Sequence, residues 1–282
     1  MKYYHVDVFS EKPMKGNGLT VVFPDKLYGG DQLLRIAVEF RQFETVFAFE
    51  RNVDGSFPVR IFTVTEELGF AGHPIVGVGA VLHSLYFTSK DSAEIPIDLQ
   101  GRRITVSSKR INGRYNVTMN QGVPQFLGQV ERSRCGELAR SLSLAESDLD
   151  ETLPVEVVST GLPYLLVPLK SGLDQAKISI RNFEDFLSGF GAKFVYVFDT
   201  QTLDCRTWDN YGAVEDVATG SAAGPLCAYL VEHGLAQRNK AIKIHQGRFV
   251  QRPSVIESWV SGRDEVFISG DVAFFASGEL II

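Results

Sequence analysis

Two long stretches of this chain contain no charged residue. No Asp, Glu, Lys or Arg occurs within residues 69–89, and none occurs within residues 221–231. A helix that is apolar on all sides must be covered on all sides. Glycine, histidine and serine dilute the hydrophobicity of the first stretch, which argues against a membrane span. We therefore expect two helices, each enclosed by the protein itself.

Strands are the elements available to enclose these helices. Runs rich in β-branched and aromatic residues, bounded by Gly, Pro, Asn or Asp, predict strands. These runs are 19–23, 45–49, 59–62, 155–158 and 194–198. Amphipathic spacing predicts two further helices, at 31–40 behind an Asp31 cap and at 134–142. We expect a curved sheet around each apolar helix, and we expect both amphipathic helices to lie on a face of a sheet.

The segments that lead into the two apolar helices are similar. Each has a strand containing an arginine, then an acidic turn and a loop of small residues. Aligning Arg60 with Arg206 places His73 opposite Thr219, with few identities, so the repeat signal is weak. A length of 282 residues favours two domains. We predict an N-terminal half over 1–120, a C-terminal half over 121–265, and a final strand over 266–282 that packs back on the N-terminal half.

Composition restricts the partners of this protein. A net charge of −6 without a basic cluster argues against nucleic acid. Asp7 interrupts the apolar run that a signal peptide would need, so we expect a cytoplasmic protein with no membrane association. Three widely spaced cysteines predict reduced, mostly buried thiols, and the five histidines show no metal-ligand spacing. We expect no metal and no cofactor.

Two loops are suited to binding an anion. A loop of small residues that runs into a helix leaves backbone N–H groups at the positive end of the helix dipole. In ATGSAAG, the Ser221 hydroxyl would either cap the helix or bond a substrate carboxylate. In AGHPIVG, Pro74 suits a first helical turn and His73 stands just ahead of it. Two such helix starts facing one cleft would suit a small acidic substrate.

Several motifs in one order resemble the PhzF-like (phenazine biosynthesis-like) isomerase family. They are HVDVFSEKPMKGNGLTVV, IAVEFRQFETVF, FTVTEELGFAGHPIVG, VEDVATGSAAGPLCAYL, HQGRFVQRPSVI and GDVAFFASGEL. The resemblance implies a diaminopimelate epimerase-like α/β (α+β) fold. This fold has two pseudo-symmetric domains, each a central buried helix wrapped by a mainly antiparallel, barrel-like sheet. It also implies a homodimer.

The resemblance further implies a cofactor-independent isomerase that moves a proton on a small carboxylate-bearing substrate. Glu44 resembles the catalytic carboxylate of the family. The substrate-binding groups would be His73, Asp216, Gly220 and Ser221. A carboxylate from Asp216 near His73 would favour the charged imidazolium. A carboxylate can act as base and then as acid in one turnover if burial raises its pKa toward neutrality.

Two alternatives stay open at this point. The first is an epimerase or racemase of the same fold that does not use thiols, since no cysteine lies in either loop. The second is a non-enzymatic protein that binds small acids, against which the retained Glu44 argues. Four loop positions depart from the usual family residues and put the substrate in doubt; they are Gly18, Val64, Pro74 and Val217.

Overall fold

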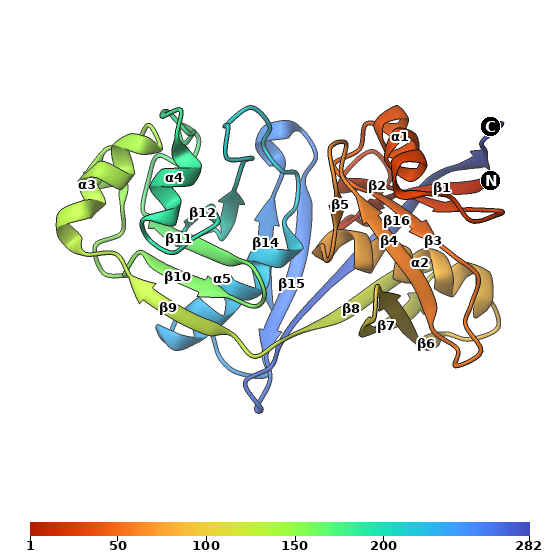
Figure 1. Cartoon of the computed structure of the whole chain (residues 1–282). Helices are drawn as coiled ribbons and strands as arrows, with labels where there is room; N and C mark the ends of the chain where they lie inside the picture. The colour runs from red at the N-terminus through yellow and green to blue at the C-terminus, as the bar shows by residue number, and fades with distance from the viewer. The chain divides into compact units, whose positions relative to one another are not determined.

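A computed structural model describes all residues from 1 to 282, and they divide into two compact units. The first unit consists of Met1–Asn120 and Ser269–Ile282, and the second of Gln121–Ile268. Both units combine one sheet with a few helices (Figure 1). No helix in the structure has both the length and the apolar character needed to cross a membrane.

The first unit is a closed barrel. Its elements are β1 (Lys2–Val8), β2 (Asn17–Phe23), α1 (Gly30–Phe40), β3 (Thr45–Ala48), β4 (Phe57–Phe62), β5 (Glu67–Leu68), α2 (Gly72–Tyr86), β6 (Ser92–Leu99), β7 (Arg102–Ile111), most of β8 (Arg114–Gly122) and the later part of β16 (Val266–Glu279). The strand order is β1-β2-β3-β4-β6-β7-β8-β16, and β16 pairs again with β1. Only the β2–β3 and β4–β6 pairs are parallel.

Helix α2 occupies the interior of this barrel. Every residue from Gly72 to His83 is buried, and the helix contacts β1, β2, β3, β6 and β7. Glycines allow the close approach of helix to sheet: a Cβ at Gly79 would meet the Val106 side chain at 2.8 Å and that of Val117 at 3.1 Å. On the outer face, Leu33 and Ala37 of α1 pack against Val22, Phe47 and Phe62.

The second unit also has a buried helix packed against a sheet, but no pairing joins the two outer strands of that sheet. Its elements are β9 (Gln125–Gln129), α3 (Arg132–Ser141), η1 (Glu146–Asp148), β10 (Glu156–Ser159), β11 (Pro163–Leu169), α4 (Phe183–Ser188), β12 (Phe194–Asp199), β13 (Asp204–Arg206), α5 (Gly220–Glu232), β14 (Ile242–Gln246), η2 (Arg248–Val250), β15 (Ser254–Val260) and the start of β16. The strand order is β9-β10-β11-β12-β13-β14-β15-β16. The parallel pairs are β11–β12 and β13–β14.

The two units share a pattern of connections. In each unit one parallel strand pair is joined through an outer helix, α1 or α4, and the next through the buried helix, α2 or α5. Helix α5 contacts β10, β11 and β15, and nearly all of its residues are buried. The predicted architecture, two similar α/β units with a barrel-like sheet around a central helix, is confirmed.

Two helix starts differ from the prediction. Asp31 does not cap α1: the N-cap is Gly29, whose N–H donates to the Gln32 side chain at 3.1 Å. Helix α5 begins at Gly220 with Thr219 as its N-cap. His73 and Ser221 are each the second residue of their helix, so these two positions correspond in the repeat. The alignment of the arginines, which matches His73 with Thr219, is therefore wrong by two residues.

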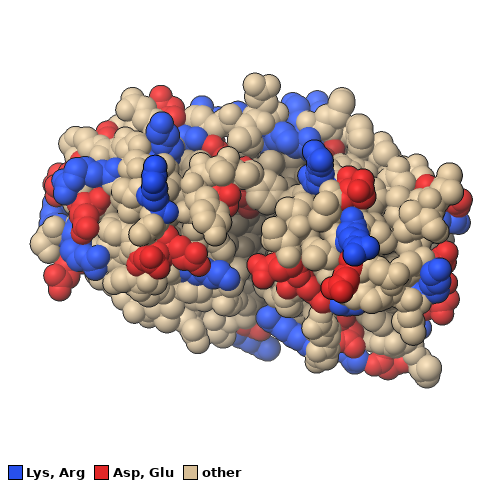
Figure 2. All heavy atoms as spheres, turned by 45° about the horizontal axis from the view of Figure 1, so that its top comes forward, with Lys and Arg blue, Asp and Glu red and all other residues tan.

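Surface charges of the two signs are mixed. Figure 2 shows Lys and Arg side chains interleaved with Asp and Glu over the face that it displays. Many exposed arginines form ion pairs with a carboxylate, including Arg103–Asp54, Arg110–Asp91, Arg114–Glu11, Arg132–Glu151 and Arg248–Asp204. Water screens such exposed pairs, so each contributes little to stability.

Candidate functional site

Glu44 lies between α1 and β3. Helix α1 ends when Arg41 adopts the left-handed conformation, with a φ of 53°, and this turns the chain toward β3. Glu44 directly precedes Thr45, which pairs with Thr20 of β2 and with Phe62 of β4. Only 15% of the Glu44 side chain is exposed. The carboxylate is therefore held against the barrel and does not extend into solvent.

His73 faces Glu44 from the second residue of α2. Its Nε2 atom lies 3.3 Å from Oε2 of Glu44, and its side chain is 7% exposed. Its other ring nitrogen, Nδ1, is 3.4 Å from Nδ2 of Asn17, at the start of β2. The first unit thus brings together two of the predicted site residues.

The Asn17 contact defines the tautomer of His73. An amide nitrogen can only donate a hydrogen bond, so Nδ1 must accept and the ring proton is on Nε2, the nitrogen that faces Glu44. Burial lowers the pKa of His73 from 6.5 to about 3. The imidazole is therefore neutral at ordinary pH. The expected charged imidazolium is wrong, because desolvation in the barrel interior disfavours the cation.

The His73–Glu44 contact is close but poorly aligned. His73 Nε2 is buried and forms no hydrogen bond of standard geometry within the chain, although Glu44 Oε2 is only 3.3 Å away. Buried donors in native proteins rarely lack a well-aligned acceptor. Catalytic hydrogen bonds are often loose in the absence of substrate and tighten when it binds.

The second unit holds the other three predicted site residues around the start of α5. Gly220 and Ser221 are the first two residues of this helix, and Asp216 lies in the loop before it. The Gly220 carbonyl accepts a hydrogen bond from Nε2 of Gln121 at 2.9 Å. The first N–H groups of a helix have no partner inside it, so this end of α5 is suited to an anionic group.

Ser221 has a specific partner. Its hydroxyl lies 2.7 Å from the hydroxyl of Tyr164 on β11. Because no side chain caps α5, the interpretation of Ser221 as a helix cap is wrong. Its hydroxyl is half-buried at the helix start, next to a tyrosine that is buried.

Asp216 is bound by its own loop. Thr219 donates a hydrogen bond from Oγ1 to Oδ2 of Asp216, and the Asp216 N–H donates to the carbonyl of Thr207 at 3.0 Å. The neighbouring Glu215 forms a bidentate ion pair with Arg206, with distances of 3.0 and 2.6 Å. The loop before α5 is therefore tied to the sheet at two consecutive residues.

The first unit has an ion pair that corresponds to the Arg206–Glu215 pair of the second unit. Arg60 donates from Nε and Nη2 to the two carboxylate oxygens of Glu67, at 2.7 and 2.6 Å. His73 follows Glu67 by six residues, and Ser221 follows Glu215 by the same number. Each unit therefore joins the loop before its buried helix to a strand arginine by the same side-on contact.

The sequence did not single out Asn17, Tyr164, Thr219 and Gln246 as contact residues of this site. Three of them lie inside motifs that carry the family resemblance, namely GNGL, VATGS and HQGRF. A search for buried polar residues within those motifs could have found them. Tyr164 lies in an apolar strand, PYLLVPL, where nothing distinguishes it from a core tyrosine.

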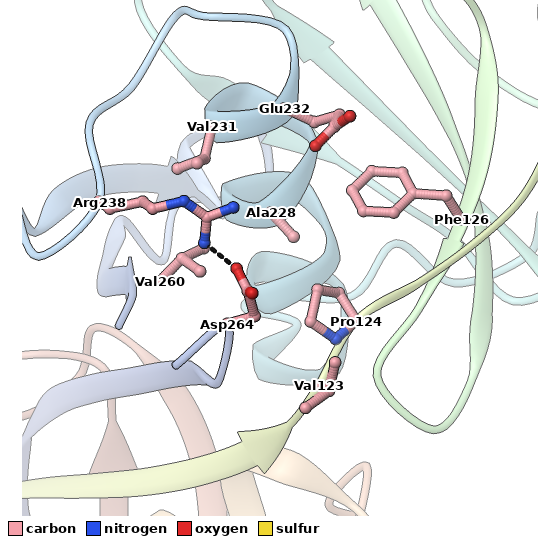
Figure 3. A pocket seen from close by; sticks show the side chains of 9 residues that line it. All are labelled: Val123, Pro124, Phe126, Ala228, Val231, Glu232, Arg238, Val260 and Asp264. Carbon is pink, nitrogen blue, oxygen red and sulfur yellow. Dashed lines mark hydrogen bonds and ion pairs between the residues drawn. The ribbon is translucent and has the colours of Figure 1, made fainter. Parts of the chain in front are cut away.

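The pocket in Figure 3 is separate from these residues. It has a volume of about 270 Å³ and lies in the second unit beside the last turns of α5. Its lining comprises Val123, Pro124, Phe126, Ala228, Val231, Glu232, Arg238, Val260 and Asp264. The end of α5 at Glu232 is about 18 Å along the helix from Gly220. None of the predicted site residues lines this pocket.

The cysteines do not have the environment of reactive thiols. Cys205 and Cys227 are buried, and burial raises the pKa of both, that of Cys227 to about 11. The half-buried Cys135 also has a raised pKa, because of burial and the nearby Glu146. A thiol acts as a base or nucleophile only as the thiolate. No group of three or more His, Cys, Asp or Glu side chains is arranged to hold a metal.

Comparison with known proteins decides the family. The model of the family described as phenazine biosynthesis-like protein matches residues 6–278. The chain belongs to this family. The trans-2,3-dihydro-3-hydroxyanthranilate isomerase of Pseudomonas chlororaphis is 31% identical over 291 residues, covering 99% of both chains. This member of the phenazine biosynthesis-like family is therefore an isomerase.

Solved structures agree with this assignment. A structure described as a predicted epimerase from Pseudomonas aeruginosa is 39% identical, with a TM-score of 0.93, and covers 100% of this family member and 99% of that chain. A hydroxyproline epimerase from Agrobacterium vitis is 12% identical, with a TM-score of 0.62 over 99% of this chain and 91% of the other. The second likeness concerns the fold alone, and it extends the same architecture to epimerases.

Proposed function

We propose that this protein isomerises a small carboxylate-bearing substrate by proton transfer through Glu44, without a metal or an organic cofactor. The observation that carries the proposal is the 3.3 Å contact between Glu44 Oε2 and Nε2 of the buried His73. A carboxylate with one buried N–H donor beside it is suited to taking up and returning a proton.

The reaction would proceed in two steps. The Glu44 carboxylate takes a proton from a substrate carbon, and the electrons of the broken C–H bond enter the adjacent unsaturated system. The double bond moves, and the Glu44 carboxylic acid returns the proton to a different carbon. The composition of the substrate does not change, so no oxidant or reductant is needed. His73 would donate from Nε2 to Glu44 or to the developing negative charge.

The second unit would supply the groups that bind the acid. We assign the substrate carboxylate to the start of α5, where the Gly220 and Ser221 N–H groups and the Ser221 hydroxyl are available. Asp216 would accept a hydrogen bond from a donor on the substrate. The named substrate of the Pseudomonas chlororaphis relative is an amino acid with a hydroxylated, partly saturated ring, and we propose a substrate of that class here.

An exchange experiment in D2O tests this function. The protein is incubated with trans-2,3-dihydro-3-hydroxyanthranilate, and separately with a panel of cyclic and open-chain amino acids, and NMR follows the carbon-bound protons. Isomerisation predicts a shifted double bond, with deuterium at the new carbon in those turnovers in which the proton on Glu44 exchanges with D2O before it is returned. Absence of both a shifted double bond and exchange with every compound would contradict the proposal and support a protein that only binds small acids.

Epimerisation is a second candidate, favoured by the likeness to a structure described as an epimerase. In that reaction the proton returns to its original carbon from the opposite face. The same experiment distinguishes the two, because epimerisation places deuterium at the original carbon and inverts its configuration without moving a double bond.

We also propose a homodimer located in the cytoplasm. The dimer follows from the family resemblance, and the location from three cysteines that form no disulfide with one another. Light scattering of the purified protein tests the dimer, for which the expected mass is twice 31.2 kDa. A single species of one chain would contradict it. Fractionation of cells that produce the protein tests the location.

A further inference from the structure

Gln246 makes four hydrogen bonds at the end of β14. Its Oε1 accepts from the Tyr196 hydroxyl at 2.9 Å and from the Thr219 N–H at 3.0 Å. Its Nε2 donates to the Asp216 carbonyl at 2.9 Å and to Thr219 Oγ1 at 3.0 Å. Only 2% of Gln246 is exposed. The full hydrogen-bonding capacity of this buried amide is used.

Backbone groups determine how this amide is oriented. The Thr219 N–H can only donate and therefore identifies Oε1, while the Asp216 carbonyl can only accept and therefore identifies Nε2. Because Nε2 also donates to Thr219 Oγ1, the Thr219 hydroxyl must direct its own proton elsewhere. That proton goes to Oδ2 of Asp216.

We propose that Gln246, acting through Thr219, is a positioning residue that orients the Asp216 carboxylate and keeps its Oδ2 as a hydrogen-bond acceptor. The proposal rests on the function assigned above, in which Asp216 binds the substrate. It adds Gln246 and Thr219 to the residues on which substrate binding depends.

Two other contacts of the loop act on its backbone and on Glu215. The Arg206–Glu215 pair and the Asp216 N–H to Thr207 bond hold the backbone of the loop. The Asp216 side chain receives a hydrogen bond from Thr219. Gly247, next in sequence to Gln246, has a φ of +84°, and a side chain there would collide with the carbonyls of Val217 and Arg252. The end of β14 is thus fitted closely to the loop.

Three variants test the proposal. Thr219→Val removes the hydroxyl, Thr219→Ser retains it, and Gln246→Glu retains the shape of residue 246 but replaces the amide donor by an acceptor. With trans-2,3-dihydro-3-hydroxyanthranilate as substrate, we expect KM to rise about tenfold in Thr219→Val and Gln246→Glu, because the Asp216 carboxylate loses a hydrogen bond. We expect kcat to change far less. Thr219→Ser should restore a KM close to that of the wild type.

A matched control and a second readout separate positioning from general destabilisation. Thr118→Val makes the same substitution in the first unit, where the Thr118 hydroxyl donates to Ser269 at 3.0 Å, and KM should not change. Hydrogen exchange followed by mass spectrometry should show faster exchange of residues 214–222 in Thr219→Val and Gln246→Glu, and not in Thr219→Ser.

The outcomes are distinct. A wild-type KM together with unchanged exchange of residues 214–222 in Thr219→Val would overturn the positioning role. An equal rise of KM in Thr219→Ser would also overturn it, because the hydroxyl would then be irrelevant. If the wild-type protein does not turn over the compound, the proposed function fails for that substrate, and the exchange rates of residues 214–222 still decide whether Gln246 and Thr219 order the loop.

Discussion

His73 Nε2 lies 3.3 Å from Glu44 Oε2, and the Asn17 amide on the opposite side of the ring places the imidazole proton between these two atoms. A neutral histidine in this position donates a hydrogen bond without adding a positive charge. Glu44 therefore has a buried, neutral donor beside it, in contact with the carboxylate that the proposed reaction uses as base and then as acid.

The first prediction concerns acid stability. The pKa of His73 is about 3 in the folded protein and 6.5 in the unfolded chain, so between these values only the unfolded chain binds the proton. The contribution of His73 to stability is fully present above pH 6.5 and is lost as the pH falls toward 3, by at most about 1.4 kcal/mol per pH unit.

Urea denaturation of the wild type and of His73→Gln between pH 4 and pH 7.5 measures this effect. The difference in unfolding free energy between the two proteins should move in favour of the variant as the pH falls. A difference that stays constant with pH would show that His73 titrates normally in the folded protein.

The two arginine–glutamate pairs should differ in their contribution to stability. The side chains of Arg206 and Glu215 are 10% and 9% exposed, whereas those of Arg60 and Glu67 are 27% and 25% exposed. Removing one partner of a buried pair leaves an uncompensated charge, so Glu215→Gln should cost about 3 kcal/mol. Glu67→Gln should cost about 1 kcal/mol or less, because water screens that pair. Equal losses in urea denaturation would contradict the difference in burial.

The sequence allowed the helix in the interior of each unit to be predicted. A helix without a single charge could be stable only inside the protein, and abundant strands indicated what would surround it. The pairing of the strands could not be predicted, because β16 returns from residue 266 to pair with β1 across almost the whole length of the chain. No local pattern contains such a long-range contact.

The candidate site residues could be predicted from the sequence, but their chemical state could not. Glu44, His73, Asp216, Gly220 and Ser221 came from the family resemblance, and their roles stay predictions. The protonation state of His73 could not be read from the sequence, because it depends on burial and on Asn17, which is 56 residues away. Aligning the two arginines also gave the wrong correspondence between the helix starts. The second unit has two additional residues between its arginine and its glutamate.

A glycine in the first barrel should resist substitution. Gly79→Ala would gain up to about 1 kcal/mol of helix propensity, but the new methyl group would collide with Val106 and Val117 in the barrel wall. Overpacking costs about 1–3 kcal/mol, so we expect a net loss of stability. Gly136→Ala in α3 is the control, because the group nearest its new Cβ is the mobile end of Glu146. A higher Tm for Gly79→Ala would show that the barrel has space around α2.

The Ser221 hydroxyl should contribute to the binding of acids. Ser221→Ala removes both its donor and its contact with Tyr164, and affinity for 3-hydroxyanthranilate should fall about tenfold, as for a lost hydrogen bond to a charged group. Tyr164→Phe removes only the partner and should have a smaller effect. Calorimetric titration gives both affinities. If the two variants bind as tightly as the wild type, Ser221 is not part of the site.

The most direct test of the account is deuterium exchange catalysed by Glu44→Gln. Glutamine keeps the shape of the side chain but cannot take up the proton, so kcat should fall by at least about 10²–10⁴-fold. Affinity for 3-hydroxyanthranilate should stay within about threefold of the wild type. Glu39→Gln, an exposed residue of α1, is the matched control and should exchange normally. Loss of isomerisation and of exchange in Glu44→Gln alone is the predicted result, and isomerisation or deuterium incorporation at the wild-type rate in that variant would contradict the account.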